Sequence, residues 1–130
     1  MKILKMTDDL FIQRRRVMDM LYEARKVLSM DLPRIKVRIV DFEKNTNTLG
    51  MCFIDKNYIT ISKDIGAWNE DYLRHIVWHE LAHAYFRAEH DVNCPLMHPV
   101  ANIGQKRDVL VNALKNQSKK IRMEENLVAS

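Results

Sequence analysis

With 130 residues that are 47% hydrophobic and 29% charged, and with only three glycines and three prolines, the chain fits one globular domain spanning residues 1–130 and does not fit a disordered polypeptide. Two cysteines are too few for a disulfide framework, and neither a signal-peptide-like start nor an apolar window of about 18 residues occurs, so we expect a cytoplasmic protein without membrane attachment. The net charge of +4 permits contact with nucleic acid, although solvated surfaces often have the same balance.

The first half of the chain predicts one helix followed by three strands. From Asp9 to about Met30, apolar residues recur at three- and four-residue spacing, which is typical of an amphipathic helix. Apolar and basic residues alternate over Arg34–Val40, which predicts a strand with one face in the core. Two short β-rich runs, Leu49–Ile54 and Tyr58–Ser62, follow with turn residues between them, which predicts a hairpin.

The second half predicts a central helix, a loop and a last helix. Asn69 supplies an N-cap, and the helical period then continues nearly to residue 89. Two prolines mark Asp91–Gly104 as a loop, and a final helix beginning near Val109 is expected to fray into a polar, basic tail over about residues 115–130. The order of these helices and strands along the chain predicts an α+β fold in which helices pack on a small mixed or antiparallel sheet.

The sequence HELAH, from His79 to His83, lies in the predicted central helix and fits the zinc-binding pattern H-E-x-x-H. Residues four apart lie on one helix face about 6 Å apart in rise, so both imidazoles can bind one ion. Glu80 lies about 100° round the helix, where it can act as a general base on a zinc-bound water. The motif predicts one Zn²⁺ and peptide-bond hydrolysis, with Glu80 passing the proton to the departing amine.

Three further histidines surround this pair, and helical geometry limits which of them can join it. His75 lies about 12 Å from His83 along the helix axis, so it cannot bind the same ion. We expect it either at the surface or in contact with one of the metal ligands without binding the metal itself. If the helix continues to Ala88, His90 lies about 10 Å beyond His83, too far to complete the site. These distances leave the third ligand open.

The stretch HELAHAYFRAEHDVNCPLMHP resembles the metzincin pattern H-E-x-x-H-x-x-G-x-x-H with its methionine turn. In this resemblance His90 is close to the third-histidine position, and Met97 lies in the turn. The sequence departs from the pattern at Phe86, where that family has the glycine that turns the chain. It departs again at Glu89, which occupies the strict third position.

A second resemblance, to SprT-like zinc metallopeptidases, covers more of the chain, from about Pro33 to Leu114. TLGMCF, NYITIS and LRHIVWHELAHAYF are similar to the strand pair and zinc helix of that family. The resemblance implies a zincin-like catalytic domain in which a histidine from the following proline-containing loop, His98 here, is the third ligand. We therefore expect His98 and keep His90 as the alternative. Weaker candidates are Glu89, Asp91, Cys94 and Asp108.

The expected substrate is a protein or peptide. An exposed edge at Tyr58, Ile59 and Thr60 would pair with an extended peptide through main-chain hydrogen bonds. The SprT-like resemblance includes proteases that act on DNA-associated proteins, and the basic tail would suit DNA or a DNA-bound protein as partner. The alternative function is a zinc-containing, non-catalytic module that binds protein or DNA and keeps a vestigial protease site.

Overall fold

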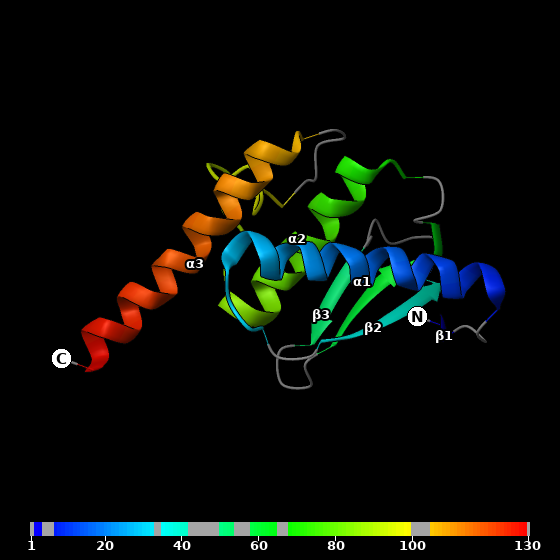
Figure 1. Ribbon diagram of the computed structural model, residues 1–130, viewed down its shortest axis with the longest axis horizontal. Helices are drawn as coiled ribbons and strands as arrows, with labels where there is room; N and C mark the ends of the chain where they lie inside the picture. The colour runs from blue at the N-terminus through cyan, green and yellow to red at the C-terminus, as the bar shows by residue number, and fades with distance from the viewer. Residues whose placement is uncertain are drawn as a thin grey trace.

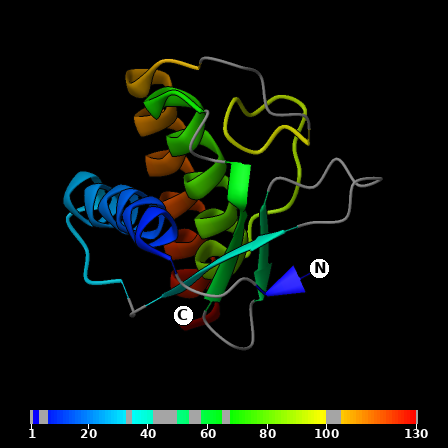
Figure 2. The same ribbon diagram turned by 90° about the vertical axis from the view of Figure 1, so that its right-hand side faces the viewer.

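The computed structural model describes the chain except for residues 1, 4–6, 33–34, 42–49, 54–57, 65–67, 100–104 and 130. Its elements are, in order, β1 (Lys2–Ile3), α1 (Asp8–Leu28), β2 (Lys36–Asp41), β3 (Gly50–Phe53), β4 (Tyr58–Ser62), α2 (Glu70–Phe86) and α3 (Arg107–Ala129). Figure 1 shows α1 crossing in front of α2, and Figure 2 shows both helices on the same side of the sheet. The predicted α+β class is confirmed.

The described strands form a four-stranded mixed sheet in the order β1-β2-β4-β3. β3 pairs antiparallel with β4, which confirms the predicted hairpin, while β2 pairs parallel with β4 and β1 antiparallel with β2. In β2, Val37 and Ile39 are buried and Lys36 and Arg38 are exposed, as the alternation of the sequence predicts. Val40 is also buried, so the second face of this strand is not wholly solvated.

β4 lies inside the sheet, so the prediction of an exposed edge at Tyr58, Ile59 and Thr60 is wrong. Backbone partners occupy both sides of the strand, β2 on one and β3 on the other. Ile59 and Thr60 are fully buried. The long-range parallel pairing with β2 removes the edge that a hairpin alone would leave, and the open edge on this side of the described sheet belongs to β3.

The ends of α1 follow from local chemistry. The side chain of Thr7 accepts a hydrogen bond from the Leu10 N–H at 3.2 Å, and two aspartates occupy the first turn, where the helix dipole favours negative charge. At the other end Ser29 takes a left-handed conformation, with φ 51°, and its N–H donates to the carbonyls of Arg25 and Lys26. The helix therefore ends at Leu28, two residues before the predicted limit.

α2 is the central element of the core. It begins after the predicted N-cap Asn69, whose side chain accepts from the Tyr72 N–H at 2.8 Å. Unlike a surface helix, it is buried on nearly all sides, because the sheet, α1 and α3 all contact it. Trp78 is fully buried at its midpoint, and its indole N–H donates to the Met20 carbonyl of α1 at 2.9 Å. This packing fixes the position of the neighbouring HELAH segment.

One carboxylate joins the three helices. Glu23 of α1 accepts hydrogen bonds from Arg74 of α2 at 2.9 and 3.2 Å and from Arg107 of α3 at 2.7 Å. Burial alone raises the pKa of Glu23, but the hydrogen bonds and charges of the two arginines outweigh it, and the pKa falls below its ordinary value. The Arg74 side chain is only 8% exposed, so its charge depends on its two carboxylate partners, Glu23 and, at 3.1 Å, Asp71.

α3 runs to Ala129, which is much longer than the predicted last helix with its fraying tail. The tail stays helical because its sequence is amphipathic: Leu114, Gln117 and Ser118 are buried, whereas Lys115 and Lys119 are exposed. Figure 1 shows its final turns extending beyond the rest of the molecule. Within the described part of the chain, no helix is both long and apolar enough to cross a membrane.

Candidate metal centre

The helix that carries HELAH ends earlier than its sequence predicts. Arg87 takes a left-handed conformation, with φ 52° and ψ 31°, although it is not a glycine. Its N–H and that of Ala88, at 3.1 Å, both donate to the Ala82 carbonyl, which closes the last turn. The chain consequently leaves the helix axis after Phe86 and can turn back toward the histidine pair.

Two backbone carbonyls orient the histidine pair. Nδ1 of His79 lies 2.7 Å from the Leu96 carbonyl oxygen, and Nδ1 of His83 lies 2.6 Å from that of Ala88. A carbonyl only accepts, so each Nδ1 carries the hydrogen and each Nε2 presents a lone pair in the neutral ring. The two Nε2 atoms lie 3.0 Å apart. Two acceptors at this separation are stable only with a proton or a cation between them.

His90 joins this pair. Its ring centroid lies 5.2 Å from that of His79 and 4.8 Å from that of His83. Among the described residues these three side chains form a group whose ligand atoms all lie within 4.8 Å of one another. Zn–N bonds of about 2.0–2.1 Å in a tetrahedral site put nitrogens about 3.3 Å apart, so the set fits a metal ion with modest side-chain adjustment.

Burial keeps two of these imidazoles uncharged near neutral pH. Desolvation lowers the pKa of His79 to about 4, partly offset by the hydrogen bond to Leu96, with the neighbouring histidines lowering it further. The pKa of His83 is also lowered, mainly by burial. Metal ligation requires the neutral ring, and the lowered pKa values of both imidazoles favour that form.

Glu80 follows the first histidine and is buried, with 8% of the residue exposed. Burial raises the pKa of its carboxyl to about 7. A carboxyl in this range can both accept and donate a proton near neutral pH, which is the property that a general acid–base group needs. The motif therefore combines two oriented imidazoles with a carboxyl of raised pKa on one helix.

The loop after α2 does not place His98 where the sequence analysis expects it. His98 is half-buried, its N–H donates to the Cys94 carbonyl at 3.0 Å, and it is not part of the three-histidine group. The preference for His98 assumes a helix that continues to about residue 89. Because the helix ends at Phe86, the chain turns back early enough to bring His90, the alternative, to the pair.

Other parts of the loop hold this turn in place. The Asp91 N–H donates to the carbonyl of Met97 at 2.9 Å, and Met97 itself is fully buried in the core. Glu89 is exposed, and neither it nor Asp91, Cys94 or Asp108 belongs to the histidine group. Cys94 is a free, half-buried thiol that accepts a hydrogen bond from Gln117 at 3.5 Å.

His75 is 1% exposed, so the surface position considered for it is wrong. It lies one turn before His79 in the buried part of α2, and its charge is one of the minor influences that lower the pKa of His79. Sequence reasoning also missed the Leu96 and Ala88 carbonyls that orient the two imidazoles. Main-chain acceptors have no residue signature, so no sequence pattern could identify them.

No protein-family model matches the sequence, and no curated protein matches it. Among solved structures, the chain is similar to the crystal structure of the metallopeptidase zymogen abylysin of Pyrococcus abyssi. The two share 19% identity with a TM-score of 0.49, over 85% of this chain and 94% of the other. This similarity is too weak to transfer any feature from one protein to the other.

Proposed function

We propose that the chain is a zinc-dependent metallopeptidase in which His79, His83 and His90 hold one zinc ion. The observation that carries the proposal is the convergence of three imidazoles, two of them locked by carbonyls so that their Nε2 lone pairs face each other. Three protein nitrogens leave the fourth tetrahedral position open, which is the mark of a catalytic zinc site and not of a structural one.

The arrangement of the ligands follows the metzincin-like resemblance more closely than the SprT-like one. The third histidine comes seven residues after the second, and the methionine of the following turn is buried in the core, with its carbonyl tied to Asp91. The glycine at which the metzincin chain turns is absent, and Arg87 makes the turn in its place. This supports His90 as the ligand.

Zinc held by His79, His83 and His90 would supply an electrophile able to polarise the scissile carbonyl and to acidify water. Glu80 takes the proton as the water oxygen bonds to the carbonyl carbon, and returns it to the amide nitrogen as the C–N bond breaks. Burial, which raises the pKa of this carboxyl in the metal-free protein, favours its taking up the proton. The carbonyls of Leu96 and Ala88 keep the imidazoles in the required tautomer throughout.

An extended peptide would bind along β3. This strand is at the open edge of the described sheet, and it also contacts α2, the helix that carries the motif. Main-chain hydrogen bonds along such an edge hold a substrate without demanding a particular side chain. The peptide-binding edge is therefore β3 and not the predicted β4, and we expect low specificity for substrate side chains.

A second role, contact with DNA, is favoured by one observation. Lys115, Lys119 and Lys120 are all exposed on one side of α3, so their ammonium groups can reach phosphates together. Replacing all three by Gln is expected to lower affinity for a DNA duplex and to flatten its salt dependence. Unchanged binding and an unchanged salt slope in this variant would remove the proposal.

The test of the proposed function is cleavage of an unfolded casein by zinc-loaded protein. Glu80→Gln is expected to lower kcat/KM by about 10²–10⁴-fold while the bound zinc stays at the wild-type level. Glu70→Gln is the matched control, because it makes the same change at an exposed position of the same helix and should leave cleavage unchanged. Full activity in Glu80→Gln would refute the mechanism and favour a non-catalytic binding module.

A further inference from the structure

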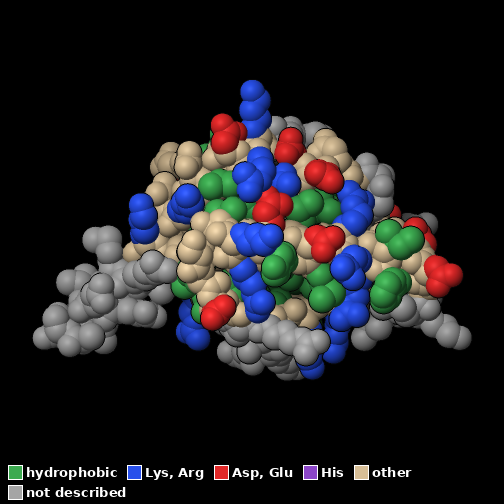
Figure 3. Space-filling model, viewed as in Figure 1, with side chains coloured by type: hydrophobic (Ala, Val, Ile, Leu, Met, Phe, Trp, Pro, Cys, Tyr) green, Lys and Arg blue, Asp and Glu red, His purple; other side chains and the backbone are tan. Residues whose placement is uncertain are grey.

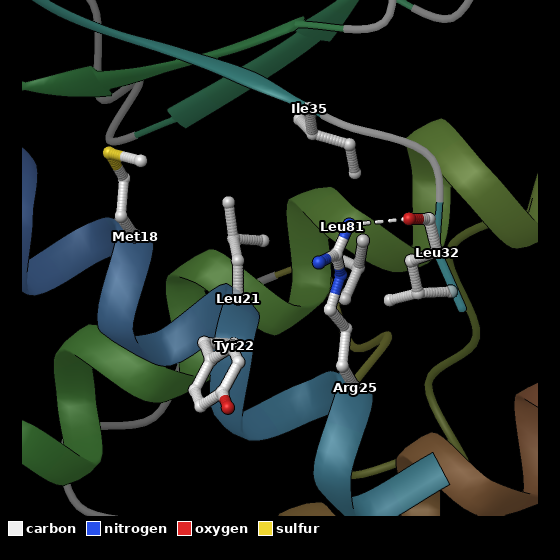
Figure 4. Close-up of a pocket in the computed structure, with 7 residues that line it drawn as sticks. All are labelled: Met18, Leu21, Tyr22, Arg25, Leu32, Ile35 and Leu81. Atoms are coloured by element: carbon white, nitrogen blue, oxygen red, sulfur yellow. Dashed lines mark hydrogen bonds between the residues drawn. The ribbon is translucent and has the colours of Figure 1, made fainter. Parts of the chain in front are cut away.

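A pocket of about 290 Å³ lies on the face of the molecule formed by α1. Its apolar lining comes from α1, from the segment leading to β2 and from α2: Met18, Leu21, Tyr22, Leu32, Ile35 and Leu81. Figure 4 shows Leu21, Ile35 and Leu81 pointing into the same space from these three elements. Leu81 is two residues from His79, about 200° round α2, so the pocket is on the opposite side of that helix from the histidines.

Exposed apolar side chains extend the pocket along α1. Tyr22 is 57% exposed and Met18 41%, and Phe11, nearer the start of the helix on the same face, is 58% exposed. Large apolar groups on one outward helix face, beside an apolar hollow, mark an interaction surface more often than an ordinary solvated helix. A volume of 290 Å³ is at the low end for ligand pockets and suits one or two side chains of a protein partner.

Two arginines bracket this surface. One face of α1 carries, at positions i, i+4, i+7 and i+11, the residues Arg14, Met18, Leu21 and Arg25. The Cα atoms of the two arginines are therefore about 16 Å apart along the helix axis. Nε of Arg14 is buried and has no hydrogen-bond partner among the described residues. Arg25 lines the pocket and donates to the Leu32 carbonyl (Figure 4), but it forms no ion pair with any described carboxylate.

None of the described acids pairs with Arg14 or Arg25. Asp19 pairs with Arg15 at 3.4 Å, and Glu23 is taken by Arg74 and Arg107. Lys26 lies over the Tyr22 ring, 4.8 Å from its centroid. Asp31 is an exposed acid next to Leu32, whereas Lys36 is exposed next to Ile35. Figure 3 shows Lys and Arg side chains interspersed with hydrophobic ones over this face.

We propose that this surface is a docking site for an acidic segment of a partner protein, with one or two apolar side chains in the pocket and carboxylates on Arg14 and Arg25. The two arginines are about 16 Å apart, which an extended chain spans in about five residues. Apolar burial supplies affinity, and the two arginines fix register and select acidic partners. The surface needs no metal, so it stands independently of the proposed peptidase function.

The test is fluorescence anisotropy with a labelled peptide that has a Phe-Leu pair between runs of Asp and Glu, in the Glu80→Gln background so that no cleavage occurs. The peptide is expected to bind, and binding should weaken by about tenfold in Arg14→Gln and in Arg25→Gln. Met18→Ala should weaken it by about threefold. Arg15→Gln, which removes the same charge from the exposed, Asp19-paired neighbour, should change it by less than about twofold.

Four results would overturn the proposal. One is that the acidic peptide does not bind, and another is that an analogue with Asn and Gln in place of the acids binds equally well. The third is that Arg15→Gln weakens binding as much as Arg14→Gln, which would indicate general charge attraction. Binding to phosphatidylserine vesicles without binding to the peptide would assign the surface to a lipid headgroup and also refute it. Circular dichroism and thermal unfolding confirm that each variant is folded.

Discussion

Replacing Arg87 by glycine tests the turn on which the whole metal centre depends. Arg87 has φ 52°, and a left-handed conformation costs a residue with a Cβ about 1–2 kcal/mol. Glycine removes this cost but adds about 0.4–1 kcal/mol of conformational entropy to the unfolded chain. The net effect is a gain of about 0.5–1 kcal/mol in the free energy of unfolding, and a rise in Tm of about 2–4 °C.

The assay is thermal and urea unfolding followed by circular dichroism, with bound zinc measured on the same samples. Ser29→Gly is the matched positive control, because Ser29 ends α1 with φ 51° and should gain similarly. Ala88→Gly is the matched negative control, since Ala88 is not among the described residues with positive φ, and it should lose about 0.5–1 kcal/mol. If Arg87→Gly destabilises the protein as Ala88→Gly does, α2 does not end at Phe86 and the placement of His90 is wrong.

Three further predictions concern the core and the metal. Glu23→Gln should lower the free energy of unfolding by about 2 kcal/mol at neutral pH, because the buried Arg74 loses one of its two carboxylate partners and Arg107 loses its ion pair with Glu23. The folded-state pKa of Glu23 is lowered from 4.5, so the stability that its carboxylate contributes is present above pH 4.5 and is lost as the pH falls through the folded-state pKa. Urea unfolding should therefore show the stabilities of the variant and the wild type converging in acid. A difference that stays constant with pH would contradict the ion pairing of Glu23. Trp78→Phe should cost about 1–3 kcal/mol in the same assay, because the indole's hydrogen bond to the Met20 carbonyl is lost and a smaller ring fills a fully buried site, and a change within error would contradict that hydrogen bond. Zinc at about 100 times its Kd should stabilise the wild type by about 2.7 kcal/mol, reversed by a chelator, whereas His83→Ala should show no such shift; an equal shift in that variant would place the ion elsewhere.

The beginnings of the helices and the hairpin could be predicted from sequence, because each depends on neighbouring residues. Asn69 caps α2 through its own side chain, and the alternation of Val37 and Ile39 predicts a strand face in the core. The pair His79 and His83 needs only the helical repeat to lie together. Such local features are encoded within a few residues.

What sequence reasoning missed depends on contacts between distant residues or on unusual backbone. The helix end at Arg87 has no composition signal, because glycine usually occupies such a position. The interior position of β4 follows from its parallel pairing with β2, which no hairpin pattern predicts. The orienting contact between His79 and the Leu96 carbonyl joins residues 17 apart. The third member of the histidine group depends on the first of these, which is why the sequence favours His98 with His90 as the alternative, whereas the structure groups His90 with the pair.

The most direct test of the central claim is the zinc content of His90→Ala and His98→Ala, measured after dialysis against a chelator of moderate affinity. The geometry predicts that His90→Ala loses its zinc, because two imidazoles remain from a three-nitrogen site, while His98→Ala retains one ion per chain as the wild type does. Retention of zinc by His90→Ala together with its loss from His98→Ala would contradict the account.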